Sequence, residues 1–402
     1  MKIPNHITTL GLSALLALLP VATQGEVTIA KKKNQDKVEK PIAAAKKSDQ
    51  AKVQIAILLD TSSSMSGLIE QTKTQLWKIV NTFIDAKRNG QVPYVEVALY
   101  EYGKSALNKE ENWIRRIQPL TRDLDEISKR LFSLTTNGGE EYCGAVIQRA
   151  TTDLKWDDSN KVYKAIFIAG NEAFTQGPIS SSESVKEAIS KGVIVNTIHC
   201  GNEQVGISGG WKQGATLADG KFLTIDHNRA VVHIEAPQDA EIVKLNTKLN
   251  NTYVAYGKIG VLKKLDQVAQ DTNANAKAAS GASVQRAVSK GSKNYWNGNW
   301  DLVDASKQKD FDITKVEKKD LPKELQAMTT ERLKAQVAKM DQQRVAIQKQ
   351  IMELNKKRNT YVAEKRKEMA EKEGNKAEKT LDEAVASTVR AQAEKKGYAF
   401  EK

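Results

Sequence analysis

The chain has 402 residues, enough for one good-sized domain with extensions, and its two cysteines are too few for a disulfide-built scaffold. Lysine-rich ends supply much of the formal net charge of +13, which fits either a solvated basic surface or attraction to anionic cell-envelope polymers. Nucleic acid is a poor candidate partner despite this charge, because the sequence contains no basic–aromatic patch typical of a known nucleic-acid-binding module.

The N-terminus is typical of a secretory signal peptide, which we place at residues 1–25. Lys2 precedes an apolar run, residues 10–21, that is too short to span a bilayer with margin. The alternative is an uncleaved membrane anchor. Residues 26–52 are rich in Lys, Ala and Gln and predict a basic flexible linker. We therefore expect an extracytoplasmic mature protein, either periplasmic or on the cell surface.

Apolar strands alternate with amphipathic helices over residues 53–230. This alternation predicts an α/β fold: a doubly wound, mostly parallel sheet with helices on both faces. The expected strands are 55–59, 94–102, 113–117, 163–169, 193–199 and 221–225, and the expected helices begin near Leu68 and cover 124–134, 145–154 and the segment around Val185 and Ile189.

Two further regions follow the predicted sheet domain. Residues 231–320 predict a mainly helical extension whose tyrosines and tryptophans we expect to be buried for structural reasons. Residues 321–402 are dominated by Lys, Glu, Ala and Gln. Apolar residues there fall at alternating spacings of four and three, which predicts a C-terminal coiled coil able to mediate self-association; the alternative is a single charged helix without a partner. The expected seam is Leu333, Val337, Met340, Arg344, Ile347, Ile351, Leu354, Arg358 and Tyr361.

The first expected strand ends at an acid followed by two spaced hydroxyls, Asp60, Ser62 and Ser64. One carboxylate and two hydroxyls on a strand-to-helix loop suit a hard divalent cation that prefers oxygen ligands. The alternative is a helix N-cap on an unrelated α/β fold.

This D-x-S-x-S pattern after a buried strand resembles the metal-ion-dependent adhesion site (MIDAS) of von Willebrand factor type A (VWA) domains. Segments 138–144 and 169–177 further resemble an exported bacterial subgroup of that family. The resemblance implies three loops that meet over the carboxyl ends of the strands, with Mg²⁺ as the ion.

The second and third loops depart from the family pattern. Glu140 follows the Gly-Gly turn where the family has threonine, and in the third loop Glu172 or Asn171 would take the place of aspartate. Added carboxylates favour cation binding and would admit Mn²⁺ or Ca²⁺. The alternative for Glu140 and Glu141 is that they cap the next helix.

Cys143 and Cys200 are both expected near the carboxyl edge of the sheet. In an exported protein such a pair predicts a disulfide that would covalently link two of the binding loops. The alternative is two free thiols available for redox chemistry.

The sequence favours a non-enzymatic binding protein. By its resemblance, the domain would use a divalent cation to bind an acidic group on a protein partner. One alternative is an envelope structural protein with a degenerate metal site. A thiol-redox enzyme or a metal-assisted hydrolase is another, but the sequence contains neither a C-x-x-C motif nor a His-rich metal motif.

Overall fold

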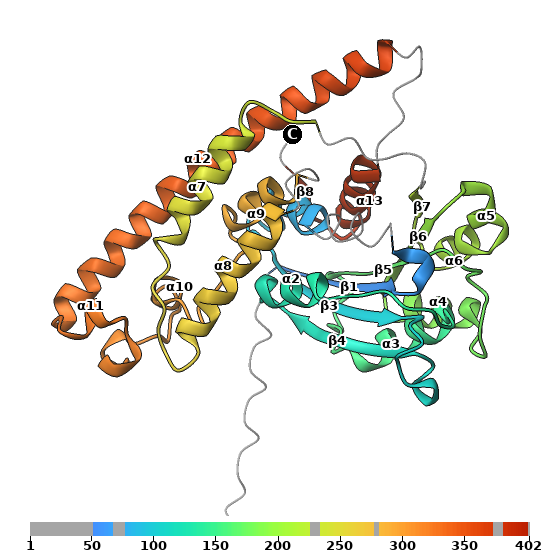
Figure 1. Ribbon diagram of the computed structural model, residues 1–402, viewed down its shortest axis with the longest axis horizontal. Coiled ribbons are helices and arrows are strands. Elements are labelled where there is room, and N and C mark those ends of the chain that lie inside the picture. Colours follow the sequence, from blue (N-terminus) through green and yellow to red (C-terminus); the bar gives the residue numbers. More distant parts are fainter. Residues whose placement is uncertain (1–50, 67–76, 226–233, 277–280, 373–380, 401–402) are drawn as a thin grey trace, which may run out of the picture. The chain divides into compact units, whose positions relative to one another are not determined.

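The computed structural model describes residues 51–66, 77–225, 234–276, 281–372 and 381–400 (Figure 1). The predicted signal peptide, nearly all of the predicted linker and the expected helix start near Leu68 lie outside these residues. The segment Asp49–Lys402 forms one compact unit. Within the described residues, none of the helices combines the length and the apolar character that crossing a bilayer requires.

Six strands form the main sheet in the order β4-β3-β1-β5-β6-β7 (Figure 1). All neighbouring pairs are parallel except β3 and β4, which are antiparallel. From β1 the chain continues outward to β3 and β4 on one side, and it then returns to β5 on the other side of β1 and continues outward to β6 and β7. This is the topological switch point at which open α/β sheets bind ligands. The predicted mostly parallel, doubly wound sheet is therefore confirmed. The strands are β1 (Lys52–Asp60), β3 (Tyr94–Tyr102), β4 (Ile114–Thr121), β5 (Tyr163–Gly170), β6 (Ile194–Cys200) and β7 (Phe222–Ile225).

Helices cover both faces of the sheet, because the central strands are apolar on both sides. Residues such as Ile55 and Ile57 of β1 face one core, and Ala56 and Leu58 face the other. The second core is closed by α3 (Cys143–Asp153), α4 (Ser181–Ser190) and α6 (Trp211–Leu217); α5 (Glu203–Ser208) precedes α6. The first core is closed by the helical residues 77–82 and by α2 (Leu124–Phe132), α7 (Asp239–Asn250), α9 (Ala282–Lys290), α12 (Thr330–Lys372) and α13 (Leu381–Glu394).

The C-terminal segment completes the core of the sheet domain, which the predicted domain boundaries did not anticipate. Val385 and Val389 of α13 are fully buried in the first core. The Tyr163 hydroxyl on β5 donates to Gln392 of α13 at 2.8 Å. A two-residue strand β8 (Ala399–Phe400) pairs antiparallel with β2 (Ala86–Lys87).

The apolar seam of the long helix α12 packs within the chain, which differs from the prediction that this seam mediates self-association. Ile351 packs in the first core, and Leu333 and Val337 pack in a third cluster with residues of α10 (Leu302–Ala305) and α11 (Lys323–Gln326). A helix was correctly expected, but its apolar seam is covered by this chain's own elements rather than by another copy.

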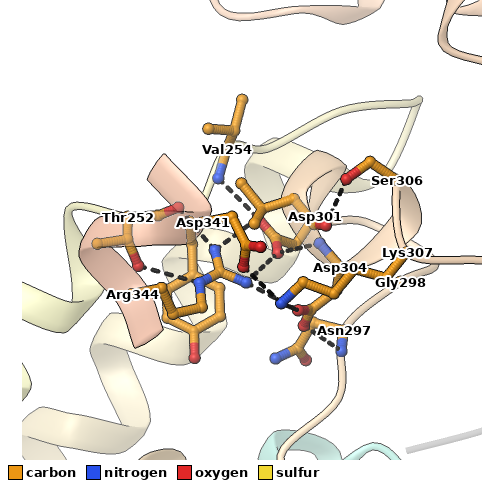
Figure 2. Close-up of polar contacts among 12 residues, drawn as sticks. Thr252, Val254, Asn297, Gly298, Asp301, Asp304, Ser306, Lys307, Asp341 and Arg344 are labelled. Carbon is orange, nitrogen blue, oxygen red and sulfur yellow. Dashed lines mark hydrogen bonds and ion pairs between the residues drawn. The ribbon is translucent and has the colours of Figure 1, made fainter. Parts of the chain in front are cut away.

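The two arginines in that seam are paired with acids of the same chain. Arg344 Nη1 donates to Asp301 at 2.6 Å and to Asp304 at 2.9 Å, as Figure 2 shows. Its guanidinium also lies 3.9 Å from the centre of the Tyr253 ring. Arg358 Nε donates to Asp239 of α7 at 2.6 Å. These contacts explain why arginine occupies seam positions without a second helix to receive it.

A second buried ionic cluster joins α2 to α8 (Gly260–Ala276) and α9. Arg286 Nη2 lies 2.8 Å from Asp125 Oδ1, and Arg286 Nε donates to Asp271 at 2.5 Å. Lys290 Nζ donates to the same Asp271 at 2.8 Å. The hydroxyl of Tyr295 donates to Asp125. The extension after residue 231 is thus bonded to the sheet domain through buried charges.

Candidate functional site

Asp60 ends β1 at the topological switch point, and the loop that follows turns back over it. Thr61 N donates to Tyr102 O of β3 at 2.9 Å, which fixes the chain direction after the strand. Ser62 N then donates to Asp60 Oδ1 at 2.7 Å, and the hydroxyls of Ser62 and Ser64 lie 2.8 Å apart. Loop one therefore presents a carboxylate and two hydroxyls together, as the sequence predicted.

Loop two approaches loop one closely because glycines allow it. Asn137 N donates to Thr61 O at 3.0 Å, and Ser105 N donates to Gly138 O. A Cβ at Gly139 would lie 2.2 Å from Gly103 O, so a side chain there would exclude this approach. Glycine is thus required at position 139 by the contact between two backbones.

The acid that loop two brings to Asp60 is Glu141. A Cβ built on Gly103 would lie 2.7 Å from Glu141 Cγ and 2.8 Å from Asp60 Oδ1, so both side chains converge on the space that Gly103 leaves open. Ser62 hydrogen-bonds with the side chains of both acids. Glu140 is exposed instead and accepts from Gln176 Nε2 at 3.3 Å.

Loop three contributes an amide and a second acid. Asn171 Oδ1 accepts from the Ser64 hydroxyl at 3.0 Å, which links loop three to loop one. His199 Nε2 lies 3.2 Å from Asn171 O, and Trp211 Nε1 donates to Glu172 O at 2.7 Å, so the loop backbone is held from two sides. The negative charge of Glu172 acts on both Asp60 and Glu141.

Burial and mutual repulsion disfavour the charged forms of the two central acids. Burial raises the pKa of Asp60 to about 6; hydrogen bonds from Ser62 and Asn171 oppose this shift, and Glu172 adds to it. Burial also raises the pKa of Glu141 to about 7, and the charges of Asp60 and Glu172 raise it further. A cation between these loops would offset both the lost hydration and the repulsion.

The residues present fit a hard divalent cation. Asp60 is fully buried, yet its Oδ2 atom has no hydrogen-bond partner among the described residues. The groups around it are oxygens, namely the hydroxyls of Ser62 and Ser64 and the carboxylate of Glu141, which are the donors that Mg²⁺, Mn²⁺ and Ca²⁺ prefer. The described residues contain no cluster of three or more His, Cys, Asp or Glu side chains arranged to hold a metal. Any ion here would therefore depend on hydroxyls and water as well as on acids.

The predicted disulfide between Cys143 and Cys200 is wrong, because both cysteines are free and buried. Cys143 packs in the second core beside the Tyr102 hydroxyl at 3.6 Å. Cys200 packs in the first core with Ile198, on the opposite face of the sheet. Two side chains separated by a sheet cannot reach bonding distance.

This chain is similar to solved protein structures over less than half of its length. No protein-family model matches the sequence, and no curated protein matches it. One similar solved structure is the conserved hypothetical protein BatB from Bacteroides thetaiotaomicron, with 16% identity, 43% of this chain and 90% of that chain covered, and a TM-score of 0.34. A second is the SpRpn10 VWA domain, with 18% identity, 44% and 89% covered, and a TM-score of 0.33. A third is proximal thread matrix protein 1 from the mussel byssus with a zinc-occupied MIDAS motif, with 15% identity, 45% and 43% covered, and a TM-score of 0.34.

Proposed function

We propose that this chain is a non-enzymatic, exported binding protein that uses a divalent cation at its VWA-like site to bind an acidic group on a protein partner. The observation that carries the proposal is the buried Asp60 carboxylate at the topological switch point, with one oxygen unpartnered and the hydroxyls of Ser62 and Ser64 beside it. A buried carboxylate oxygen without a partner is costly unless a cation or water satisfies it.

In this proposal the three loops share the task of holding the ion. Asp60, Ser62 and Ser64 supply loop-one oxygens. Glu141 would serve from loop two in place of the originally expected Glu140, and Asn171 or Glu172 would serve from loop three. Mg²⁺ is the proposed ion, with Mn²⁺ or Ca²⁺ as the alternatives that the acids would admit. A partner's carboxylate would enter this shell as a further oxygen ligand or in place of one of these.

The structure gives the thiol-redox alternative little support. The nucleophilic form of cysteine is the thiolate. Burial raises the pKa of both Cys143 and Cys200 far above the usual range, so the thiolate is strongly disfavoured at neutral pH. Retention on anionic envelope polymers remains the second candidate, supported by the basic charge of the chain. Self-association through α12 is not part of the proposal, because its seam is buried against other elements of the chain.

Titration calorimetry on the metal-free full chain tests the proposal. Saturable binding of Mg²⁺, Mn²⁺ or Ca²⁺ by the native protein and by Glu203→Ala, but not by Asp60→Ala, would support it. Glu203 is the matched control because it is an exposed acid at the start of α5, just after β6. No binding to a folded native chain would overturn the metal site and leave polymer binding, whose signature is metal-independent retention that salt removes.

A further inference from the structure

Glu141 is placed unusually for a residue on a loop. It lies between α2 and α3, and its side chain is only 7% exposed. Its Cγ and the Oδ1 atom of Asp60 both approach the empty Cβ position of Gly103, at 2.7 and 2.8 Å. Two acids brought this close raise each other's pKa, and a cation between them would stabilise the charged form of both.

We propose that Glu141 is a built-in carboxylate ligand, occupying the coordination position that a partner's acid would otherwise take, so that a partner binds only by displacing it. The inference rests on the proposed function, since it concerns the same ion. It adds a regulatory property to the site: the free protein competes with its own partner.

The charges around the site favour an incoming carboxylate that replaces Glu141 over one that binds in addition to it. Asp60 and Glu141 together balance a divalent cation, and Glu172 adds a further negative charge nearby. An incoming carboxylate would then meet a neutral or negative site instead of an electropositive ion. If Glu141 moves away, the ion regains a net positive charge and can attract the incoming acid.

The surroundings allow the side chain, but not the loop backbone, to move. The start of loop two is fixed by the bonds from Asn137 and Ser105. Its end is fixed by Tyr142, whose ring makes an edge contact with Trp113 at 5.5 Å. The Glu141 carboxylate is held by hydrogen bonds with its own main chain and with the Ser62 side chain, both of which a rotation of the side chain can break. Rotation of the Glu141 side chain is therefore the movement that would free a coordination position on the ion.

Mn²⁺ bound to the full chain provides a probe that needs no knowledge of the partner. Water-proton relaxation reports how many exchangeable waters the ion retains, and calorimetry reports its affinity. The variants are Glu141→Ala, Glu141→Gln and the matched control Glu140→Gln, which changes the exposed neighbouring acid. Acetate serves as the carboxylate probe, and circular dichroism checks folding.

We expect Glu141→Ala to weaken Mn²⁺ binding by about 10-fold or more and to increase the relaxation per bound ion by the contribution of an extra water. Acetate should lower that relaxation in Glu141→Ala but leave the native chain and Glu140→Gln unchanged. If Glu141→Ala does not fold, Glu141→Gln, whose neutral amide is a weaker ligand than a carboxylate, must show an acetate response that the native chain lacks, at unchanged folding.

Two results would overturn the inference while leaving the proposed function intact: native-like affinity and hydration in the Glu141 variants, or an equal acetate response in the native chain. Failure of the native chain to bind Mn²⁺, Mg²⁺ or Ca²⁺ at all would overturn both.

Discussion

The hydroxyl of Tyr163, the first residue of the central strand β5, donates at 2.8 Å to the side-chain oxygen of Gln392, which lies 229 residues further along the chain. This bond is buried, and Gln392 also donates to Asn196 of β6 at 2.8 Å. The central strands and α13 therefore share one polar network inside an apolar core, and the sheet domain depends on residues that the sequence places far outside it.

Val389→Ala should destabilise the whole sheet domain. Val389 is fully buried in the first core, so truncating it removes apolar contacts and leaves a cavity, at a cost of about 2 kcal/mol of unfolding free energy. Val345→Ala is the matched control: Val345 is 54% exposed on α12, and its loss should change stability by less than about 0.5 kcal/mol. Urea denaturation measures both. Equal effects of the two substitutions would show that α13 is not part of the core.

Arg344→Met should be among the most destabilising single changes in the chain. It removes the main cation from the buried Asp301 and Asp304, which keep only main-chain donors and Lys307 at 3.7 Å from Asp304, and breaking a buried pair in this way costs about 3–5 kcal/mol. Arg332→Met, on an exposed position of the same helix, should change the unfolding free energy by less than about 0.5 kcal/mol. The prediction fails if thermal denaturation gives the two variants similar midpoints.

Asp271 should make stability fall in acid. Burial alone would raise the pKa of its carboxyl, but Lys290 and Arg286 lower it to about 2. Because the folded pKa lies below the unfolded value of about 3.9, the unfolded chain binds more protons between these values, and stability is lost as pH falls. The group contributes about 3 kcal/mol at neutral pH, lost mainly between about pH 4 and pH 2.

Unfolding free energies of native protein and Asp271→Asn, measured from pH 6 to pH 2, test this linkage. The variant should be less stable at neutral pH and should show a shallower decline in acid. Parallel curves would mean that the charges of Lys290 and Arg286 are compensated elsewhere.

The cysteines should behave as inert core residues. Both thiols are buried and have raised pKa values, so a chromogenic disulfide reagent should react with neither in the native protein and with both in urea. A reducing agent should leave the urea midpoint unchanged. Rapid reaction of either thiol in native buffer would contradict the burial described here.

Strand positions and loop one were predictable because local sequence determines them. The apolar run before Asp60 fixes a buried strand, and the D-x-S-x-S spacing fixes which side chains follow it. The approach of Glu141 to Asp60 was not predicted, because a family pattern locates a residue by its distance from the Gly-Gly turn, whereas its side-chain direction depends on the backbone contact between Gly139 and Gly103.

Periodicity also indicated the seam of α12 but not what covers it. Arg344 and Arg358 carried a signal, since buried arginines require buried acids, and Asp301, Asp304 and Asp239 were available in the sequence. The cysteine prediction failed on side-chain direction as well. Cys200 lies on the same face of β6 as Ile198 and Ile194. Cys143 belongs to a helix that covers the other face of the sheet.

The burial of α13 against the central strands also has a consequence for the order of events during synthesis. When β5 leaves the ribosome, α13 has not yet been made. The apolar surface of the first core that α13 will cover is therefore exposed in the nascent chain. Such a chain stays unfolded longer than one whose contacts are local. Its exposed apolar surface is consequently open to aggregation until the last helix has been made.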